Sequence, residues 1–226
     1  MYNNINSKTI YALSSAPGKS GIAVIRVSGP EAKKIGNLFN IDLIEHKKVQ
    51  IAKLVHPHNG DFIDKALVTF FKSPNSFTGE NMVELSIHGG KAIKDLIFSI
   101  LAEEENFSYA EPGEFTKIAF QNDKINLLKA ESIGDLIAAE TDIQRRQALK
   151  IMSGKSSHKF NSWRDILLKI LSNLEAKIDF PDEDLPVNIL KNIKKDSEIV
   201  KSEIKKTLND SKVGERIREG FKIAIL

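Results

Sequence analysis

Cysteine is absent from the 226 residues of this chain. Its absence excludes disulfide bonds, thiolate metal sites and a cysteine nucleophile. No apolar run approaches the ~20 residues that a membrane-spanning helix needs, and the polar start of the chain, residues 1–10, lacks the apolar core of a signal peptide. These absences predict a soluble, cytoplasmic protein that makes no membrane contact.

The chain also lacks a strong charge of either sign. The net charge is +3, with 28% charged and 41% hydrophobic residues, which is ordinary for a globular protein. Such a charge is compatible with nucleic-acid contact but does not require it. Because no stripe of arginines and aromatic residues accompanies the lysines, we interpret the lysine excess as the product of an AT-rich genome rather than as a binding face.

The first half of the sequence has the pattern of a mixed α and β domain. Short β-prone runs lie at residues 9–13, 22–28, 49–55, 63–71 and 82–88, and helical spacing occurs at 32–39 and 90–101. Because only two helices interrupt the strands, we expect an α+β domain at residues 1–120 rather than a regular βαβ repeat.

The second half has helical periodicity instead. The clearest apolar stripe runs from Trp163 to Ile178, and Pro181 should end it because proline cannot donate the helical hydrogen bond. Similar spacing at residues 130–137 and 189–208 predicts further helices. We therefore expect an all-α domain at residues 121–220, followed by a strand-like segment at 221–226.

Two Gly-Lys-Ser triplets, at residues 18–20 and 154–156, resemble the end of a phosphate-binding loop. The complete loop needs a further glycine five residues before the glycine of the triplet. Leu13 and Leu149 stand at those positions. We interpret the triplets as a turn and a helix boundary. The acidic residues at 179 and 182–184 lack the spacing and glycine of a calcium loop, so we predict no metal site there.

Glu84 lies in the middle of an alternating strand, on the side opposite Val83 and Leu85. A carboxylate at such a position needs solvent or a donor partner. It could simply face solvent, or it could accept paired N–H donors from a planar heterocycle. His88 and the two glycines after it form either a tight strand-to-helix turn or an anion-binding helix start.

Arg26 and Lys124 can each be interpreted either as structural residues or as ligand contacts. Arg26 lies in an apolar strand and could pair with an internal carboxylate or hold a ligand carboxylate with two parallel bonds. Lys124 ends an Asn-Asp-Lys triplet between two helical segments, where it could be solvated beside a helix cap or contribute to a ligand site.

Several segments together resemble the MnmE (TrmE) family of tRNA-modification GTPases over the whole length of the chain. They are Ala16–Gly18, Gly21–Gly29, Pro74–Glu80, Val83–Leu85, His88–Gly90, Pro112–Phe115, Asn122–Lys124, Ala130–Glu131, Asp135–Ile137, Ile178–Glu183 and Arg218–Gly220. Ser20 departs from this pattern, because the family usually has glycine there.

The resemblance implies a folate-binding, dimerising amino-terminal domain. Its cofactor would be 5-formyl- or methylene-tetrahydrofolate, a one-carbon donor, and the family's folate contacts fall on Arg26, Glu84 and Lys124. The resemblance assigns no catalytic residue to this chain. It also implies modification of the tRNA wobble uridine (U34) as a homodimer, with the flavin-dependent partner MnmG (GidA).

The resemblance further implies that the helical domain is incomplete. The strand at residues 221–226 would be the stub of a GTPase domain that is missing here, so GTP, Mg²⁺ and K⁺ should not bind this chain and it should not hydrolyse GTP. Two other functions remain open: a stand-alone folate-dependent one-carbon transferase, and a tRNA-binding module that uses the lysines of 191–206. Those lysines alternate with Glu198 and Glu203, which favours a solvated face.

Overall fold

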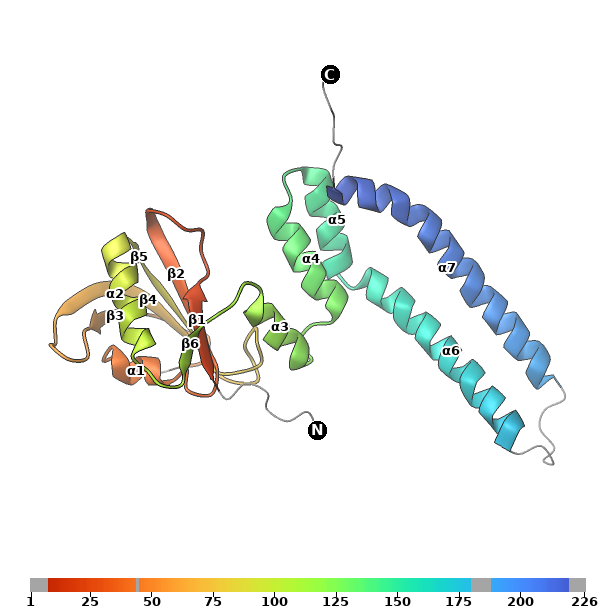
Figure 1. Ribbon diagram of the computed structural model, residues 1–226, viewed down its shortest axis with the longest axis horizontal. Coiled ribbons are helices and arrows are strands. Elements are labelled where there is room, and N and C mark those ends of the chain that lie inside the picture. The colour runs from red at the N-terminus through yellow and green to blue at the C-terminus, as the bar shows by residue number, and fades with distance from the viewer. Residues whose placement is uncertain (1–7, 44, 180–187, 220–226) are drawn as a thin grey trace, which may run out of the picture. The chain divides into compact units, whose positions relative to one another are not determined.

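The computed structural model describes residues 8–43, 45–179 and 188–219 (Figure 1). The chain divides into two compact units, Met1–Ile125 and Asn126–Leu226. The expected strand at 221–226, Pro181 and the acidic residues 182–184 lie outside the described residues.

A six-stranded sheet forms the first unit. Its strands are β1 (Thr9–Leu13), β2 (Ser20–Ser28), β3 (Val49–Val55), β4 (Phe62–Phe71), β5 (Met82–Gly89) and β6 (Phe107–Tyr109), in the spatial order β3-β4-β5-β2-β1-β6. Neighbouring strands are antiparallel except β1 and β6, which are parallel. The α+β class predicted for this part of the chain is confirmed.

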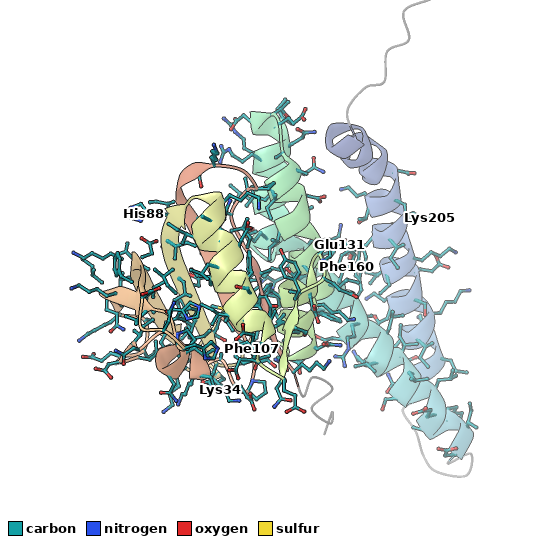
Figure 2. The ribbon with its side chains drawn as sticks, turned by 60° about the vertical axis from the view of Figure 1, so that its left-hand side comes forward. Lys34, His88, Phe107, Glu131, Phe160 and Lys205 are labelled. Carbon is teal, nitrogen blue, oxygen red and sulfur yellow. The ribbon has the colours of Figure 1, made fainter. Side chains whose placement is uncertain are left out.

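Helices α1 (Lys34–Leu38) and α2 (Lys91–Ala102) cover one face of this sheet. Ile25 of β2 and Leu85 of β5 are fully buried in the same hydrophobic cluster as Ile35 of α1 and Ile97 of α2. Phe107 lies at the β1–β6 edge (Figure 2). The centroid of its ring is 6.5 Å from that of Tyr11. This face holds the main core of the unit.

Helix α3 (Glu114–Gln121) packs on the opposite face of the sheet. A smaller cluster there joins Ile10 of β1 to Ile118 of α3, with Ala12 and Phe115 against it. Because side chains alternate along a strand, Ile10 and Tyr11 reach opposite clusters. The rest of this second face carries polar side chains together with exposed apolar ones, Ile22, Ile51 and Leu67, and the candidate site lies on it.

Four helices form the second unit: α4 (Leu127–Ala138), α5 (Asp142–Met152), α6 (Lys155–Asp179) and α7 (Ile189–Glu219). The side chain of Asn126 caps α4 by accepting from the Lys129 N–H, and Thr141 with Gln144 forms a capping box at α5. The all-α character predicted for this half is confirmed.

Helices α6 and α7 pack against each other through a thin core. Trp163 and Val200 are buried, and the Trp163 Nε1–H donates to Glu203 Oε2 at 2.5 Å. Further along the α6 stripe, Leu171 and Ile178 keep 49% and 67% of their surface exposed. Within the described residues, no helix of either unit has the length and apolar content to cross a membrane.

Candidate functional site

A row of four cross-strand neighbours on the second face of the sheet contains two of the predicted site residues. The β4–β5, β5–β2 and β2–β1 pairings place Thr69 beside Glu84, Glu84 beside Arg26, and Arg26 beside Ala12. Val83 and Leu85 point into the core on the other face. The alternation read from the sequence of β5 is therefore confirmed.

Arg26 and Glu84 form an ion pair. The guanidinium donates from Nε at 2.9 Å and from Nη2 at 2.6 Å, and both bonds go to the same oxygen, Glu84 Oε1. The two side chains remain 27% and 25% exposed. Glu84 Oε2 accepts no hydrogen bond from any residue that the structure describes.

This pairing bears on the readings left open by the sequence. Arg26 has an internal carboxylate partner, as one of its two readings proposed. Neither reading of Glu84 included a protein partner, and Glu84 has one because β2 and β5 are adjacent strands whose register sets the two residues opposite each other. What remains available on Glu84 is one oxygen rather than two.

Two phenyl rings flank the ion pair. The Arg26 Cζ atom lies 5.6 Å from the ring centroid of Phe77 and 5.6 Å from that of Phe115. Phe77 belongs to the segment that joins β4 to β5, and Phe115 belongs to α3. Aromatic faces attract a guanidinium, and the same faces can stack on a flat heterocycle.

The segment that carries Phe77, residues 72–81, is fixed by bonds from the end of α3. Lys124 Nζ donates to the Pro74 carbonyl at 2.7 Å, and the Asn122 side-chain amide donates to the Thr78 carbonyl at 2.7 Å. Lys124 is therefore not simply solvated beside a helix cap. It holds the loop that supplies one of the two rings, which connects all three predicted site residues to one region.

A buried hydroxyl network underlies the same loop. Ser28 and Thr78, both fully buried, share a 2.7 Å hydrogen bond, and Ser28 Oγ also donates to Glu80 Oε2 at 2.9 Å. Burial raises the pKa of the Glu80 carboxyl, and the Ser28 bond partly opposes that rise. Ser28 lies two residues after Arg26, so alternation puts the hydroxyl that holds this carboxyl on the sheet face that carries the ion pair.

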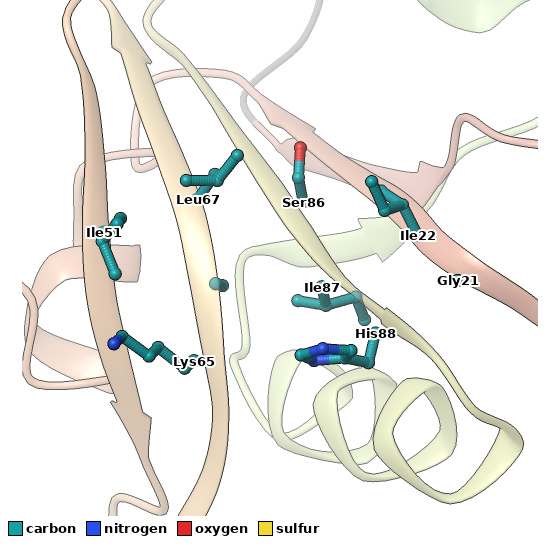
Figure 3. A pocket seen from close by; sticks show the side chains of 9 residues that line it. Gly21, Ile22, Ile51, Lys65, Leu67, Ser86, Ile87 and His88 are labelled. Atoms are coloured by element: carbon teal, nitrogen blue, oxygen red, sulfur yellow. The ribbon is translucent and has the colours of Figure 1, made fainter.

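His88 has a structural role at the end of β5. The buried carboxylate of Asp64 accepts from the His88 backbone N–H at 2.8 Å and bonds to the ring Nδ1 at 2.7 Å. His88 also lines a pocket of about 230 Å³ with Ile22, Ile51 and Lys65 (Figure 3). Gly90 follows the last residue of β5 directly as the N-cap of α2, a geometry common to the tight turn and the helix start that the sequence left open.

The two Gly-Lys-Ser triplets are a turn and a helix boundary, as predicted. The first begins in a bend and ends at Ser20, the first residue of β2, and the second begins at Gly154 in the turn between α5 and α6 and continues into the start of α6. Within the described ranges, no group of three or more histidines, cysteines, aspartates or glutamates could hold a metal ion.

Sequence patterns indicated no place in the site for Phe77, Phe115 or Asn122, although all three lie in the segments that carry the family resemblance. An aromatic residue within a polar loop motif was the available signal for Phe77. No periodicity could have indicated that Phe77 and Phe115 meet at Arg26, because they belong to a loop and a helix 38 residues apart in the sequence (115 − 77).

Comparison with known proteins agrees with the division of the chain into two units after Ile125. Residues 9–124 match the family model described as the GTP-binding protein TrmE N-terminus, and residues 127–222 match the MnmE helical domain. The chain is 58% identical over 219 residues to the tRNA modification GTPase MnmE of Pelagibacter ubique (strain HTCC1062). It is 44% identical over 220 residues to the protein of the same name from Rickettsia akari (strain Hartford).

These alignments cover 96% and 97% of this chain but 49% of each relative. The chain therefore spans about half the length of the curated relatives it matches. Both family models apply to it in the expected order. The chain belongs to the MnmE (TrmE) family of tRNA-modification GTPases and corresponds to the amino-terminal and helical regions of its members.

Proposed function

We propose that the first unit binds a reduced folate on the second face of its sheet, at Glu84. The observation that carries this proposal is the free oxygen of Glu84, whose partner Arg26 lies beside two phenyl rings. The amino-pyrimidinone edge of a pterin carries two adjacent N–H donors on a flat ring. A carboxylate with aromatic neighbours matches that chemistry, because charged acceptors make the stronger hydrogen bonds and rings favour stacking.

The cations of the site also suit a folate, because its glutamate tail is a dicarboxylate. Arg26 lies beside the Phe77 ring and Lys124 donates to the Pro74 carbonyl of the same loop, so both place positive charge at that loop. Lys124 contributes in a second way, since its bond to the Pro74 carbonyl holds that loop in place. When bound, 5-formyl- or methylene-tetrahydrofolate would supply a one-carbon unit.

Family membership suggests the setting in which this unit works. The relatives are named tRNA modification GTPases. We propose that this chain forms a homodimer through the first unit and serves modification of the tRNA wobble uridine in the cytoplasm, with the flavin-dependent MnmG (GidA) as partner. GTP, Mg²⁺ and K⁺ are expected to bind outside these residues, because neither Gly-Lys-Ser triplet has the glycine that completes a phosphate cradle.

Ligand-induced stabilisation tests the folate proposal. At about 100 times its dissociation constant, 5-formyltetrahydrofolate should stabilise the fold by roughly 2.7 kcal/mol. Glu84→Ala should lose much of this gain, because the pterin donors would have no acceptor. Glu198→Ala is the matched control, since Glu198 also pairs with a cation but lies on α7. An unchanged melting temperature of the wild type in saturating folate contradicts the proposal.

A further inference from the structure

Arg26 presents one edge of its guanidinium to Glu84. The two donors on that edge, Nε and Nη2, are bonded to the same carbon, Cζ, so that the contact is an N–C–N pair of N–H groups directed at a carboxylate. The group is planar and lies 5.6 Å from two ring centroids. Such an edge is a small, flat motif that a ligand can also present.

A 2-amino-pyrimidin-4-one ring presents the same motif. Its ring N3–H and its exocyclic amino group are attached to one carbon, lie in one plane and point in the same direction. A carboxylate accepts both through its two oxygens, as it does from a guanidinium. The ring of such a heterocycle would also make use of the Phe77 and Phe115 faces that now contact Arg26.

We propose that Arg26 competes with the ligand for Glu84: its guanidinium is an internal substitute for the N–C–N donor edge of a 2-amino-pyrimidinone ring and leaves the carboxylate when that ring binds. This inference rests on the proposed function for the location of the site. Beyond the proposed function, it assigns the Arg26–Glu84 contact the effect of lowering the protein's affinity for the ligand. It also identifies the N–C–N donor edge as the part of the ligand that displaces Arg26.

The geometry indicates that the contact can be displaced. Both Arg26 bonds converge on Oε1, whereas a strong bidentate pair would use both oxygens of the carboxylate. The two side chains are about one quarter exposed, so that water screens the attraction. If Arg26 is away from Glu84 about one tenth to one fifth of the time, the apparent affinity for the ligand is lowered about fivefold to tenfold.

The experiment measures binding of isocytosine, the isolated 2-amino-pyrimidin-4-one ring, to the full chain by NMR titration. Isocytosine should bind Arg26→Ala about fivefold to tenfold more tightly than the wild type, because the competing edge is gone. Arg26→Lys should fall between them, since an ammonium keeps the charge but has no N–C–N edge. Uracil, which lacks the amino group, should gain no affinity in any variant.

Arg145→Ala is the matched control. Arg145 contacts Asp142 on α5 with the same pattern, Nε at 2.9 Å and Nη2 at 2.6 Å to one carboxylate oxygen. Its removal should leave isocytosine binding unchanged. Equal or weaker binding of isocytosine to Arg26→Ala than to the wild type overturns the inference, and so does isocytosine that binds neither protein.

The same titrations with 5-formyltetrahydrofolate separate this inference from the proposed function. Folate binding by the wild type without tighter isocytosine binding in Arg26→Ala supports the folate site and refutes the competition. Tighter isocytosine binding with no folate binding supports the competition and refutes the folate site.

A second measurement needs no variant. The Nε–H signal of Arg26 in the ¹⁵N-labelled wild type should shift and exchange faster with solvent at saturating isocytosine, because its bond to Glu84 is lost. An unchanged signal at saturation would overturn the inference even if Arg26→Ala failed to fold.

Discussion

Replacement of Gly79 by alanine tests how tightly the Phe77 loop is held. Gly79 has φ +84°, a left-handed conformation that costs a residue with a side chain roughly 1–2 kcal/mol. Its added Cβ would also lie 3.2 Å from Asn122 Cβ and 3.2 Å from the Lys124 stem, the two residues that bond to the loop. Crowding of this kind costs about 1–3 kcal/mol. The total is therefore about 2–5 kcal/mol.

Gly60→Ala separates the two contributions. Gly60 has φ +75° in the turn between β3 and β4, and its Cβ would meet nothing within 4 Å. It should cost only the backbone strain, about 1–2 kcal/mol, or about 4–8 °C in melting temperature for a unit of this size. Urea unfolding followed by circular dichroism gives both free energies of unfolding.

The loss at Gly79 should also be local. Hydrogen exchange of amides in residues 72–81 should accelerate in Gly79→Ala and stay unchanged in Gly60→Ala, because only the first displaces Asn122 and Lys124. If the two variants unfold within about 0.5 kcal/mol of each other, and exchange in the loop is the same in both, the bonds from Asn122 and Lys124 do not fix the loop as described.

Three further predictions concern charge, assembly and the helices. Burial raises the pKa of Glu80 in the folded state, so ionisation of its carboxyl opposes folding as pH rises through that pKa. Glu80→Gln should therefore raise the free energy of unfolding at neutral pH, and this gain should vanish below the ordinary carboxyl pKa. Urea titrations at several pH values will test this. Sedimentation at micromolar concentration should give a dimer, since a two-fold interface uses the same patch on both chains, and a clean 25.2 kDa species would contradict this. Amides of α6 beyond Trp163 should exchange faster than those of β2 and β5, because Leu171 and Ile178 are largely exposed, whereas uniform protection across both units would refute that expectation.

Local pattern was sufficient to predict the strands and the longest helices. The alternation around Glu84 gave the correct faces of β5, and the stripe from Trp163 to Ile178 lies within α6. Strand β6 was not predicted, because it has three residues and depends on pairing with β1. Helix α5 lacks a clear apolar stripe, and its available signal was the capping box of Thr141 and Gln144.

The candidate site was predictable only in part, because its geometry depends on strand register. Alternation predicted that Glu84 lies opposite Val83 and Leu85, and Arg26 was recognised as a cation in an apolar strand. Neither observation showed that the two residues, 58 apart in the sequence, meet across the β2–β5 ladder. The contact of Lys124 with the Pro74 carbonyl depends on how the chain returns after α3. Such long-range contacts leave no periodic trace in a single sequence.

The sheet order has a consequence for how the protein is made. Strand β1 pairs with β2 next to it in sequence and with β6, in the register Thr9 to Phe107, near the end of the unit. Contacts between residues so far apart in the sequence form late in folding, because closing the long loop between them costs conformational entropy. Lys124 must also have left the ribosome before it can fix the Phe77 loop. A nascent first unit therefore cannot complete this site before residue 124 has been made, and any ligand of the site would stabilise only the finished fold.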